Sequence, residues 1–116
     1  MAADDCVFCR IAAGEIPATV VRETERTVAF RDVSPQAPAH VLVIPREHLV
    51  DLAEVAAADP TLLGLLLEEC TAVAASEGLA DAGYRVVVNS GADGGQAVAH
   101  CHAHVLGGRR LADQLG

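Results

Sequence analysis

One long stretch of helical periodicity lies in the middle of a chain whose other apolar segments are short. It begins at Asp59-Pro60, because Asp is a favoured N-cap and Pro a favoured first helical residue. Gly78 stands where a helix-ending glycine is expected. The apolar face between them consists of Leu62, Leu63, Leu66, Cys70, Val73 and Ala74. Since an amphipathic helix must bury its apolar face against another element, the rest of the chain has to supply a partner surface.

That partner surface is predicted to be a β-sheet, because short β-prone runs lie on both sides of the helix. The predicted strands cover residues 19–22, 27–32, 40–44, 84–89 and 98–106. A short helix is expected over residues 7–13, and one or two helical turns over 49–57. The sequence thus predicts an α+β fold with a five-stranded, mostly antiparallel sheet, one main helix and a short N-terminal helix. Open sheet edges need covering, so a homodimer is expected.

Length and charge restrict the functions of such a chain. Its 116 residues fit one domain, 1–116. A net charge of −8 and an aromatic content of 3% argue against partners such as nucleic acid or an anionic membrane surface. No apolar run is long enough to span a membrane, and the polar start of the chain lacks the pattern of a signal peptide. We therefore expect a cytoplasmic protein.

The strongest chemical feature is His100-Cys101-His102-Ala103-His104. In a strand, alternate side chains project from one face, so the three imidazoles would form a row about 13 Å long. Two neighbours can share one metal ion, whereas three in a straight row hardly can, so the row is expected to serve more than one centre. A merely solvated polar face is disfavoured, because core-type residues alternate with the histidines.

A Cys6-x-x-Cys9 pair is the second chemical feature. Structural zinc takes four nitrogen or sulfur ligands, so two histidines must complete a site that these cysteines begin. His48 follows the third predicted strand and His100 begins the fifth, which makes them the candidates. A metal-free pair of thiols is the alternative for Cys6 and Cys9. The assignment leaves His40, His102 and His104 for chemistry.

A glycine-rich segment, residues 91–96, precedes the histidines. Successive glycine N–H groups can form an anion-binding concavity, and glycine lets a phosphate approach the backbone closely. Hairpin loops are also often glycine-rich. Beside a row of histidines, the segment suggests a phosphate site.

Together these segments resemble the histidine triad (HIT) family, and within it the HINT branch of purine nucleoside phosphoramidate hydrolases. The matching segments are residues 29–48, 83–96 and 100–109, in the order typical of the family. The resemblance implies a sheet that continues across a homodimer, with a nucleotide pocket on each subunit. It implies attack by His102 on the α-phosphorus of an adenosine or guanosine 5′-phosphoramidate, followed by hydrolysis of a nucleotidyl-histidine. The nucleotide partners would be AMP, GMP and their phosphoramidate derivatives.

The resemblance also implies roles for the residues around His102. Its Nε2 must be free, so its Nδ1–H is expected to be held by a backbone carbonyl. His104 and His40 would orient the phosphate and help to move protons to the leaving amine. Asp32 would accept hydrogen bonds from the ribose. The full set of implied nucleotide contacts is Phe30, Asp32, Val33, Asn89, Gly95, Gln96, Ala97, His102 and His104.

Zinc-bearing bacterial members of the family use a matching metal set. The corresponding residues here are Cys6, Cys9, His48 and His100, which implies one structural Zn²⁺ per chain. Ala97 departs from the branch, whose members usually carry Ser or Thr directly after the Gly-Gln pair. The missing hydroxyl implies slower turnover or a different substrate.

Other functions stay open at this point. One is a nucleotide-binding regulatory module with little turnover, which Ala97 favours. A second is a dinucleoside polyphosphate hydrolase or nucleotidyl transferase, although His104 stands where transferases often have Gln. A third is a hydrolase with catalytic zinc on His40, His102 and His104. The sequence assigns no role to Cys70 or Cys101, and it does not identify the leaving amine or the preferred base.

Overall fold

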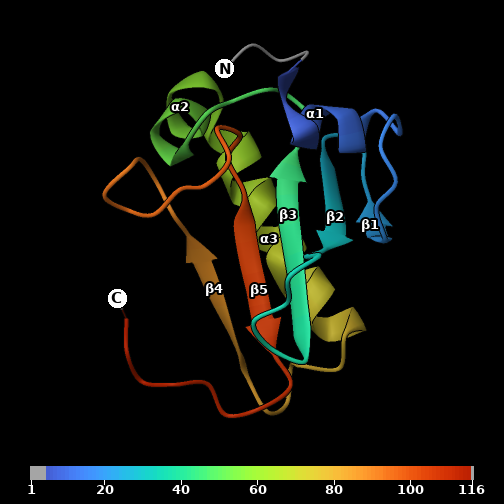
Figure 1. The fold of residues 1–116 in the computed structure, drawn as a ribbon, viewed down its shortest axis with the longest axis vertical. Helices are drawn as coiled ribbons and strands as arrows, with labels where there is room; N and C mark the ends of the chain where they lie inside the picture. The colour runs from blue at the N-terminus through green and yellow to red at the C-terminus, as the bar shows by residue number, and fades with distance from the viewer. Residues whose placement is uncertain (1–4, 116) are drawn as a thin grey trace.

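The computed structural model describes residues 5–115, so residues 1–4, considered above for a signal peptide, and residue 116 lie outside the described part. Its centre is one antiparallel sheet with strand order β1-β2-β3-β5-β4 (Figure 1). In chain order the elements are α1 (Val7–Ala12), β1 (Val20–Glu23), β2 (Thr27–Arg31), β3 (Ala39–Pro45), α2 (Leu52–Ala58), α3 (Pro60–Ser76), β4 (Tyr84–Val88) and β5 (Ala103–Gly107). The predicted α+β architecture is confirmed. Among the described residues, no helix is long and apolar enough to cross a membrane.

Helix α3 begins and ends where its capping residues require. Asp59 Oδ1 accepts a hydrogen bond from the Thr61 N–H at 3.0 Å, and Gly78 adopts the left-handed φ of +75° that glycine tolerates. The apolar side of α3 packs on one face of the sheet, behind β3 and β5 in Figure 1. This core includes Leu62, Leu66, Cys70 and Val73 from the helix and Ala29, Val41, Val43, Ala103 and Val105 from the strands.

The opposite face of the sheet carries the candidate site. Because side chains alternate along a strand, His40 and Leu42 of β3 project away from the face on which Val41 and Val43 contact α3. His104 of β5 lies directly across from Leu42 and therefore shares this second face. The short helix α1 covers part of it through Phe8, which lies in a cluster with Phe30, Leu42 and Ile44.

The start of the fifth strand is the main correction to the sequence prediction. Residues 98–102 were expected to be extended, but β5 begins only at Ala103. The His100 N–H donates to the Val98 carbonyl at 2.9 Å, and the Cys101 N–H donates to the Leu49 carbonyl at 2.7 Å. These bonds bend the chain away from strand pairing. The three histidines therefore do not form a straight row, and only His104 lies in the sheet. Other predicted boundaries differ by one to three residues.

Candidate active site and a neighbouring cysteine–histidine cluster

His102 is buried, and one of its ring nitrogens is held by the backbone. Its Nδ1 lies 2.8 Å from the carbonyl oxygen of His100. Because a carbonyl only accepts, Nδ1 must carry the hydrogen, and neutral His102 then has a lone pair on Nε2. The prediction that a backbone carbonyl holds Nδ1–H is confirmed. Since the ring also borders a cavity, His102 has the form that a nucleophilic imidazole needs.

His40 and His104 form a hydrogen-bonded pair beside His102. His40 Nε2 lies 2.9 Å from His104 Nδ1, and the His102 and His104 ring centroids are 5.0 Å apart. The Gln36 N–H donates to His40 Nδ1 at 3.0 Å. Asp32 Oδ2 lies 3.5 Å from His40 Nε2.

Burial keeps this pair neutral near pH 7. It lowers the pKa of His40, an effect that the Asp32 carboxylate opposes. Burial, followed by the neighbouring imidazoles of His102 and His40, lowers the pKa of His104 to about 4. His104 would therefore lose its charge well before neutral pH is reached from the acid side, and the lowered pKa of His40 also favours its neutral form.

A cavity of about 380 Å³ opens beside these histidines, a volume within the range of small-molecule sites. Phe30, Asp32, Val33 and Ala97 line it together with His102 and His104, as predicted for a nucleotide site. Part of the cavity wall, most of it apolar, was not predicted from the sequence. The additional residues are Val7, Phe8, Ile11, Ile16, Pro17, Ala18, Arg31, Leu42 and Val98. Phe8 could have been predicted from the apolar positions of the N-terminal helix. Its ring stands edge-on to His102, with the ring centroids 5.1 Å apart.

Three of the predicted nucleotide contacts lie in the loop before the histidines and outside the cavity lining. Gln96 Nε2 donates to the carbonyls of Val50 and Val98, at 2.6 and 2.9 Å. Asn89 Nδ2 donates to a carbonyl within the same loop, that of Gly94. A Cβ on Gly94 would lie 2.3 Å from the Ser90 carbonyl oxygen, so the loop needs glycine for its own folding. Phosphate contacts from Asn89, Gly95 and Gln96 stay predictions.

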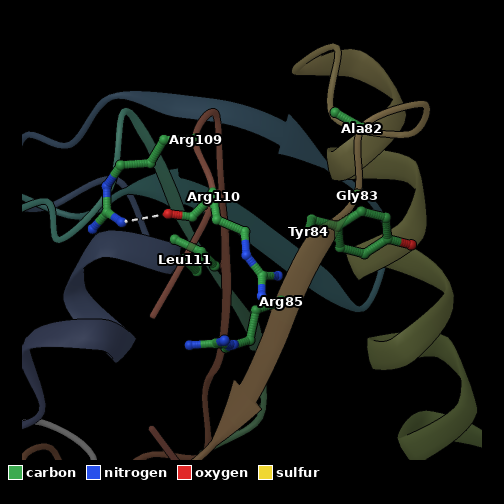
Figure 2. A pocket seen from close by; sticks show the side chains of 7 residues that line it. All are labelled: Ala82, Gly83, Tyr84, Arg85, Arg109, Arg110 and Leu111. Carbon is green, nitrogen blue, oxygen red and sulfur yellow. Dashed lines mark hydrogen bonds between the residues drawn. The ribbon is translucent and has the colours of Figure 1, made fainter. Parts of the chain in front are cut away.

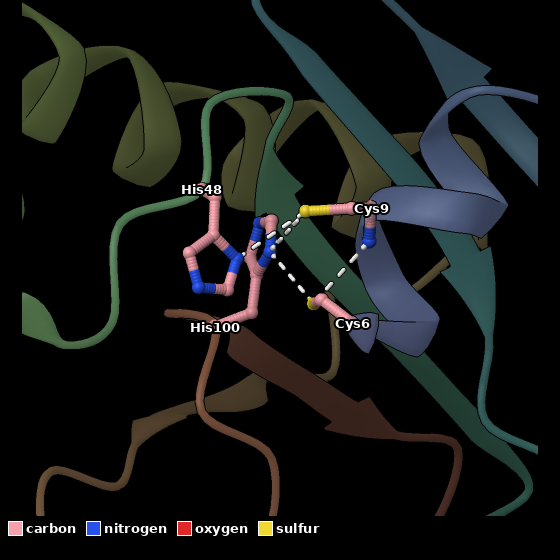
Figure 3. A group of neighbouring side chains, drawn as sticks. All are labelled: Cys6, Cys9, His48 and His100. Atoms are coloured by element: carbon pink, nitrogen blue, oxygen red, sulfur yellow. Dashed lines mark hydrogen bonds between the residues drawn. The ribbon is translucent and has the colours of Figure 1, made fainter. Parts of the chain in front are cut away.

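Cys6, Cys9, His48 and His100 converge next to the bend that precedes β5 (Figure 3). Cys9 Sγ lies 3.3 Å from His48 Nδ1 and 3.4 Å from His100 Nδ1, and Cys6 Sγ lies 3.3 Å from His100 Nδ1. All four ligand atoms lie within 4.8 Å of one another. Two thiols and two imidazoles form a donor set that suits a tetrahedral metal ion. The sequence thus correctly predicted which residues gather here.

The environment of this cluster fits a metal site. His100 Nε2 lies 2.8 Å from the Pro45 carbonyl oxygen, so Nε2 carries the hydrogen and Nδ1 turns its lone pair toward the two sulfur atoms. Burial, followed by the neighbouring Cys6, raises the pKa of the Cys9 thiol to about 11. A metal ion would bind these sulfurs as thiolates and release their protons. Among residues 5–115, His48 Nε2 is buried without a hydrogen-bond partner.

The alternative zinc site on His40, His102 and His104 does not form. The second group of close donors in the described chain consists of Asp32, His40 and His104. His102 is not in this group. In addition, a hydrogen lies between His40 and His104, where a metal ion would need two lone pairs. The arrangement favours imidazole chemistry over metal chemistry at this site.

A second hollow, of about 260 Å³, lies between the start of β4 and the segment after β5 (Figure 2). Its lining consists of Ala82, Gly83, Tyr84, Arg85, Arg109, Arg110 and Leu111. It contains neither the imidazole or thiol groups nor the carboxylates expected of a catalytic centre. Arg109 nevertheless connects it to the histidine site, because its Nη2 donates to the Gln36 carbonyl at 3.1 Å.

Comparison with known proteins identifies close relatives. Residues 13–111 match the family model of the HIT domain. The chain is 51% identical over 109 residues to an uncharacterized HIT-like protein of Synechococcus elongatus, covering 94% of this chain and 95% of the relative. It is 49% identical over 107 residues to the 14 kDa zinc-binding protein of Zea mays, covering 90% and 83%. The crystal structure of a HIT family hydrolase from Legionella pneumophila superposes with a TM-score of 0.91 at 48% identity, covering 96% of this chain and 99% of that one.

Proposed function

The chain belongs to the HIT family, and from this premise we propose that it hydrolyses purine nucleoside 5′-phosphoramidates to a nucleoside monophosphate and an amine. The observation that carries the proposal is the state of His102. Its Nδ1–H is bonded to the His100 carbonyl, so its Nε2 lone pair is available beside the cavity of about 380 Å³. Neutral imidazole is a good nucleophile near pH 7.

The proposed reaction has two displacement steps at phosphorus. His102 Nε2 forms a bond to the α-phosphorus while the phosphorus–nitrogen bond breaks, and the amine leaves with the bonding electron pair. In place of the proton transfer through His104 and His40 that the resemblance implied, the amine takes its proton from solvent, because both rings are held neutral by burial. Water then attacks the nucleotidyl-histidine, which releases the monophosphate and restores His102. Splitting one difficult displacement into two easier ones is the advantage of covalent catalysis.

The sheet register supports this placement of the nucleotide. Phe30, Leu42 and His104 lie directly across from one another on β2, β3 and β5. A purine in the apolar part of the cavity, near Phe30, would place its phosphate toward His104 and His102. Asp32, the residue after β2, also lines the cavity and is proposed to bind the ribose hydroxyls of AMP or GMP.

The decisive test is incubation with adenosine 5′-phosphoramidate. We expect release of AMP, and a rapidly quenched sample should contain protein heavier by one adenylyl group in its intact mass. AMP release without the adduct in any quenched sample would contradict the covalent step. If neither AMP nor the adduct forms, the proposed hydrolysis is wrong, and tight AMP binding would then favour the regulatory nucleotide-binding module.

Ala97 is the residue that favours the second candidate function, a nucleotide-binding module with little turnover. It lines the cavity with His102 and His104 and presents a methyl group where the resemblance implies a hydroxyl. We expect Ala97→Ser to raise phosphoramidate turnover roughly tenfold, because a hydrogen bond made mainly in the transition state contributes ~1–2 kcal/mol. Steady-state kinetics of both proteins check this. An unchanged or lower rate in a folded Ala97→Ser protein would contradict the predicted hydroxyl contact.

Asp32 provides a prediction on binding. Asp32→Ala should weaken AMP binding by about 1–3 kcal/mol, the scale of hydrogen bonds to a charged group. Titration calorimetry with AMP and with its 2′,3′-dideoxy analogue separates the ribose contact from other effects. Asp32 Oδ1 also accepts from the Ser34 N–H, so Asp32→Asn, which keeps an acceptor there, is the control for loop structure. An equal loss of affinity for both nucleotides would show that Asp32 does not contact the ribose.

We also propose that the domain, spanning residues 1–116, works as a homodimer in the cytoplasm. Strand β4 is at one edge of the sheet, and Tyr84 and Val86 on it are 37% and 36% exposed. Pairing of two β4 strands would continue the sheet across both subunits. The described cysteines are all free thiols, which suits a reducing compartment. Sedimentation equilibrium tests the dimer.

We also propose that the cluster of Cys6, Cys9, His48 and His100 holds one structural zinc ion per chain.

A further inference from the structure

The hydrogen-bond partners of His40 determine which of its nitrogens carries the hydrogen. The Gln36 peptide N–H lies 3.0 Å from His40 Nδ1. A peptide N–H can only donate, so Nδ1 must be the unprotonated acceptor. Burial lowers the pKa of His40, which keeps the ring neutral. The single ring hydrogen of His40 therefore lies on Nε2.

This assignment fixes His104 as well. His40 Nε2–H is 2.9 Å from His104 Nδ1, so Nδ1 of His104 accepts and its own hydrogen lies on Nε2. His102 has the opposite tautomer, with its hydrogen on Nδ1. Two adjacent rings thus offer different groups at Nε2: His102 has a lone pair, and His104 has an N–H donor.

The hydrogen bond between His40 and His104 does not itself choose this arrangement. If His40 carried its hydrogen on Nδ1, its Nε2 could accept from His104 Nδ1–H across the same 2.9 Å. His104 Nε2 would then present a lone pair, which repels a phosphoryl oxygen. The choice depends on the other neighbours of His40. These are the Gln36 N–H, and more weakly the Asp32 carboxylate, whose Oδ2 lies 3.5 Å from His40 Nε2.

We propose that the Gln36 peptide N–H is a positioning group for the reaction, because it sets the tautomers of His40 and His104 so that His104 presents an Nε2–H donor to the phosphoryl oxygens. This inference rests on the proposed hydrolysis. His104 keeps its hydrogen throughout and acts as a neutral donor. Negative charge on the phosphoryl oxygens is redistributed as His102 attacks, and a preorganised donor aimed at them stabilises the transition state.

The loop between β2 and β3 is built to hold this N–H in place. Asp32 Oδ1 accepts from the Ser34 N–H at 2.8 Å, and Gln36 Nε2 donates to the Ser34 carbonyl at 3.0 Å. Arg109, from the hollow shown in Figure 2, donates to the Gln36 carbonyl at 3.1 Å. The backbone of Gln36 is therefore held on both sides, by His40 at its N–H and by Arg109 at its carbonyl.

The first test reads the tautomers directly in the unmodified protein. Two-bond ¹H–¹⁵N correlation spectra of histidine-labelled protein at pH 7 distinguish Nδ1–H from Nε2–H rings, and His→Gln variants assign the signals. We expect Nε2–H rings at His40 and His104. An Nδ1–H ring at either position would overturn the proposal. This measurement needs no substrate, so it is decisive even if phosphoramidate hydrolysis proves wrong.

The second test removes the donor. Gln36→Pro lacks the N–H, whereas the matched Gln36→Ala loses only the side chain. We expect Gln36→Pro to lower kcat about tenfold with KM within about twofold, and its His104 signals to show mixed tautomers, because Asp32 still favours the original form. Gln36→Ala keeps the N–H but loses the side-chain bond to the Ser34 carbonyl, so it should keep the wild-type tautomers and lose less kcat than Gln36→Pro. A folded Gln36→Pro protein with wild-type kcat and tautomers would overturn the proposal; if that variant does not fold, the spectra of the unmodified protein decide.

Discussion

His102→Ala should reduce phosphoramidate hydrolysis by at least about a thousandfold while AMP still binds. Removal of a nucleophile abolishes the covalent route and leaves only the contribution of binding and hydrogen-bond donors. Most of the cavity lining, including Phe30, is untouched by the change, so nucleotide affinity should fall by no more than about fivefold. Rate measurements, AMP titration and intact-mass analysis on the same preparation check these expectations.

The control for this prediction must preserve the backbone bend. The His102 ring donates to the His100 carbonyl, and alanine removes that bond together with the nucleophile. In His102→Asn the side-chain amide can still donate to the carbonyl, but it offers no imidazole lone pair. Both variants should be inactive and free of the adenylyl adduct. Near-wild-type turnover in either would show that another group attacks phosphorus.

Much of the fold could be predicted because its signals are local. The bounds of α3 depend on Asp59, Pro60 and Gly78, whose backbone preferences act within one turn of the helix. The pairing of β1 with β2 follows from two β-prone runs, residues 19–22 and 27–32, that lie close together in sequence. The gathering of the four metal-cluster residues was also predictable, because the coordination chemistry of zinc asks for two more ligands beside a pair of cysteines.

The prediction was wrong where bonds between distant segments compete with local pattern. Residues 98–106 alternate like a strand, but the Leu49 carbonyl takes the Cys101 N–H and the His100 carbonyl takes the His102 ring. Neither bond can be inferred from the alternation of apolar and polar residues. The role of Gln36 was missed for a related reason: its side chain suggests a polar loop, while its backbone N–H makes the contact with His40.

Metal loss has the second largest expected effect, and it acts on stability. Zinc on the proposed ligands would join α1, the segment after β3 and the bend before β5 (Figure 3). A ligand present at a thousand times its dissociation constant stabilises the folded state by about 4 kcal/mol. Cys9→Ser should remove this stabilisation and lower the Tm by roughly 10–20 °C in a domain of this size. Calorimetry with and without a chelator measures the effect.

Cys70→Ser is the matched control, since it makes the same chemical change in the core beneath α3. Its Tm should fall for packing reasons and should still respond to chelation. The Tm of Cys9→Ser should no longer respond. Elemental analysis of gently purified wild-type protein should give one zinc per chain. If no zinc is found and the Tm changes with neither chelator nor added zinc, the metal site is wrong, and Cys6 and Cys9 are a packing pair.

Activity should depend on the same metal less strongly than stability does. The cluster contains the His100 ring, while the His100 carbonyl holds His102 Nδ1–H. Loosening the ring lets the carbonyl move, so some Cys9→Ser molecules would lose the tautomer that attacks phosphorus. The remaining connections of this segment, such as the Cys101 N–H bonded to the Leu49 carbonyl, limit that movement. Turnover of Cys9→Ser at a temperature well below its Tm should therefore fall only several-fold, and complete loss in a folded protein would instead point to a direct role of the metal in the reaction.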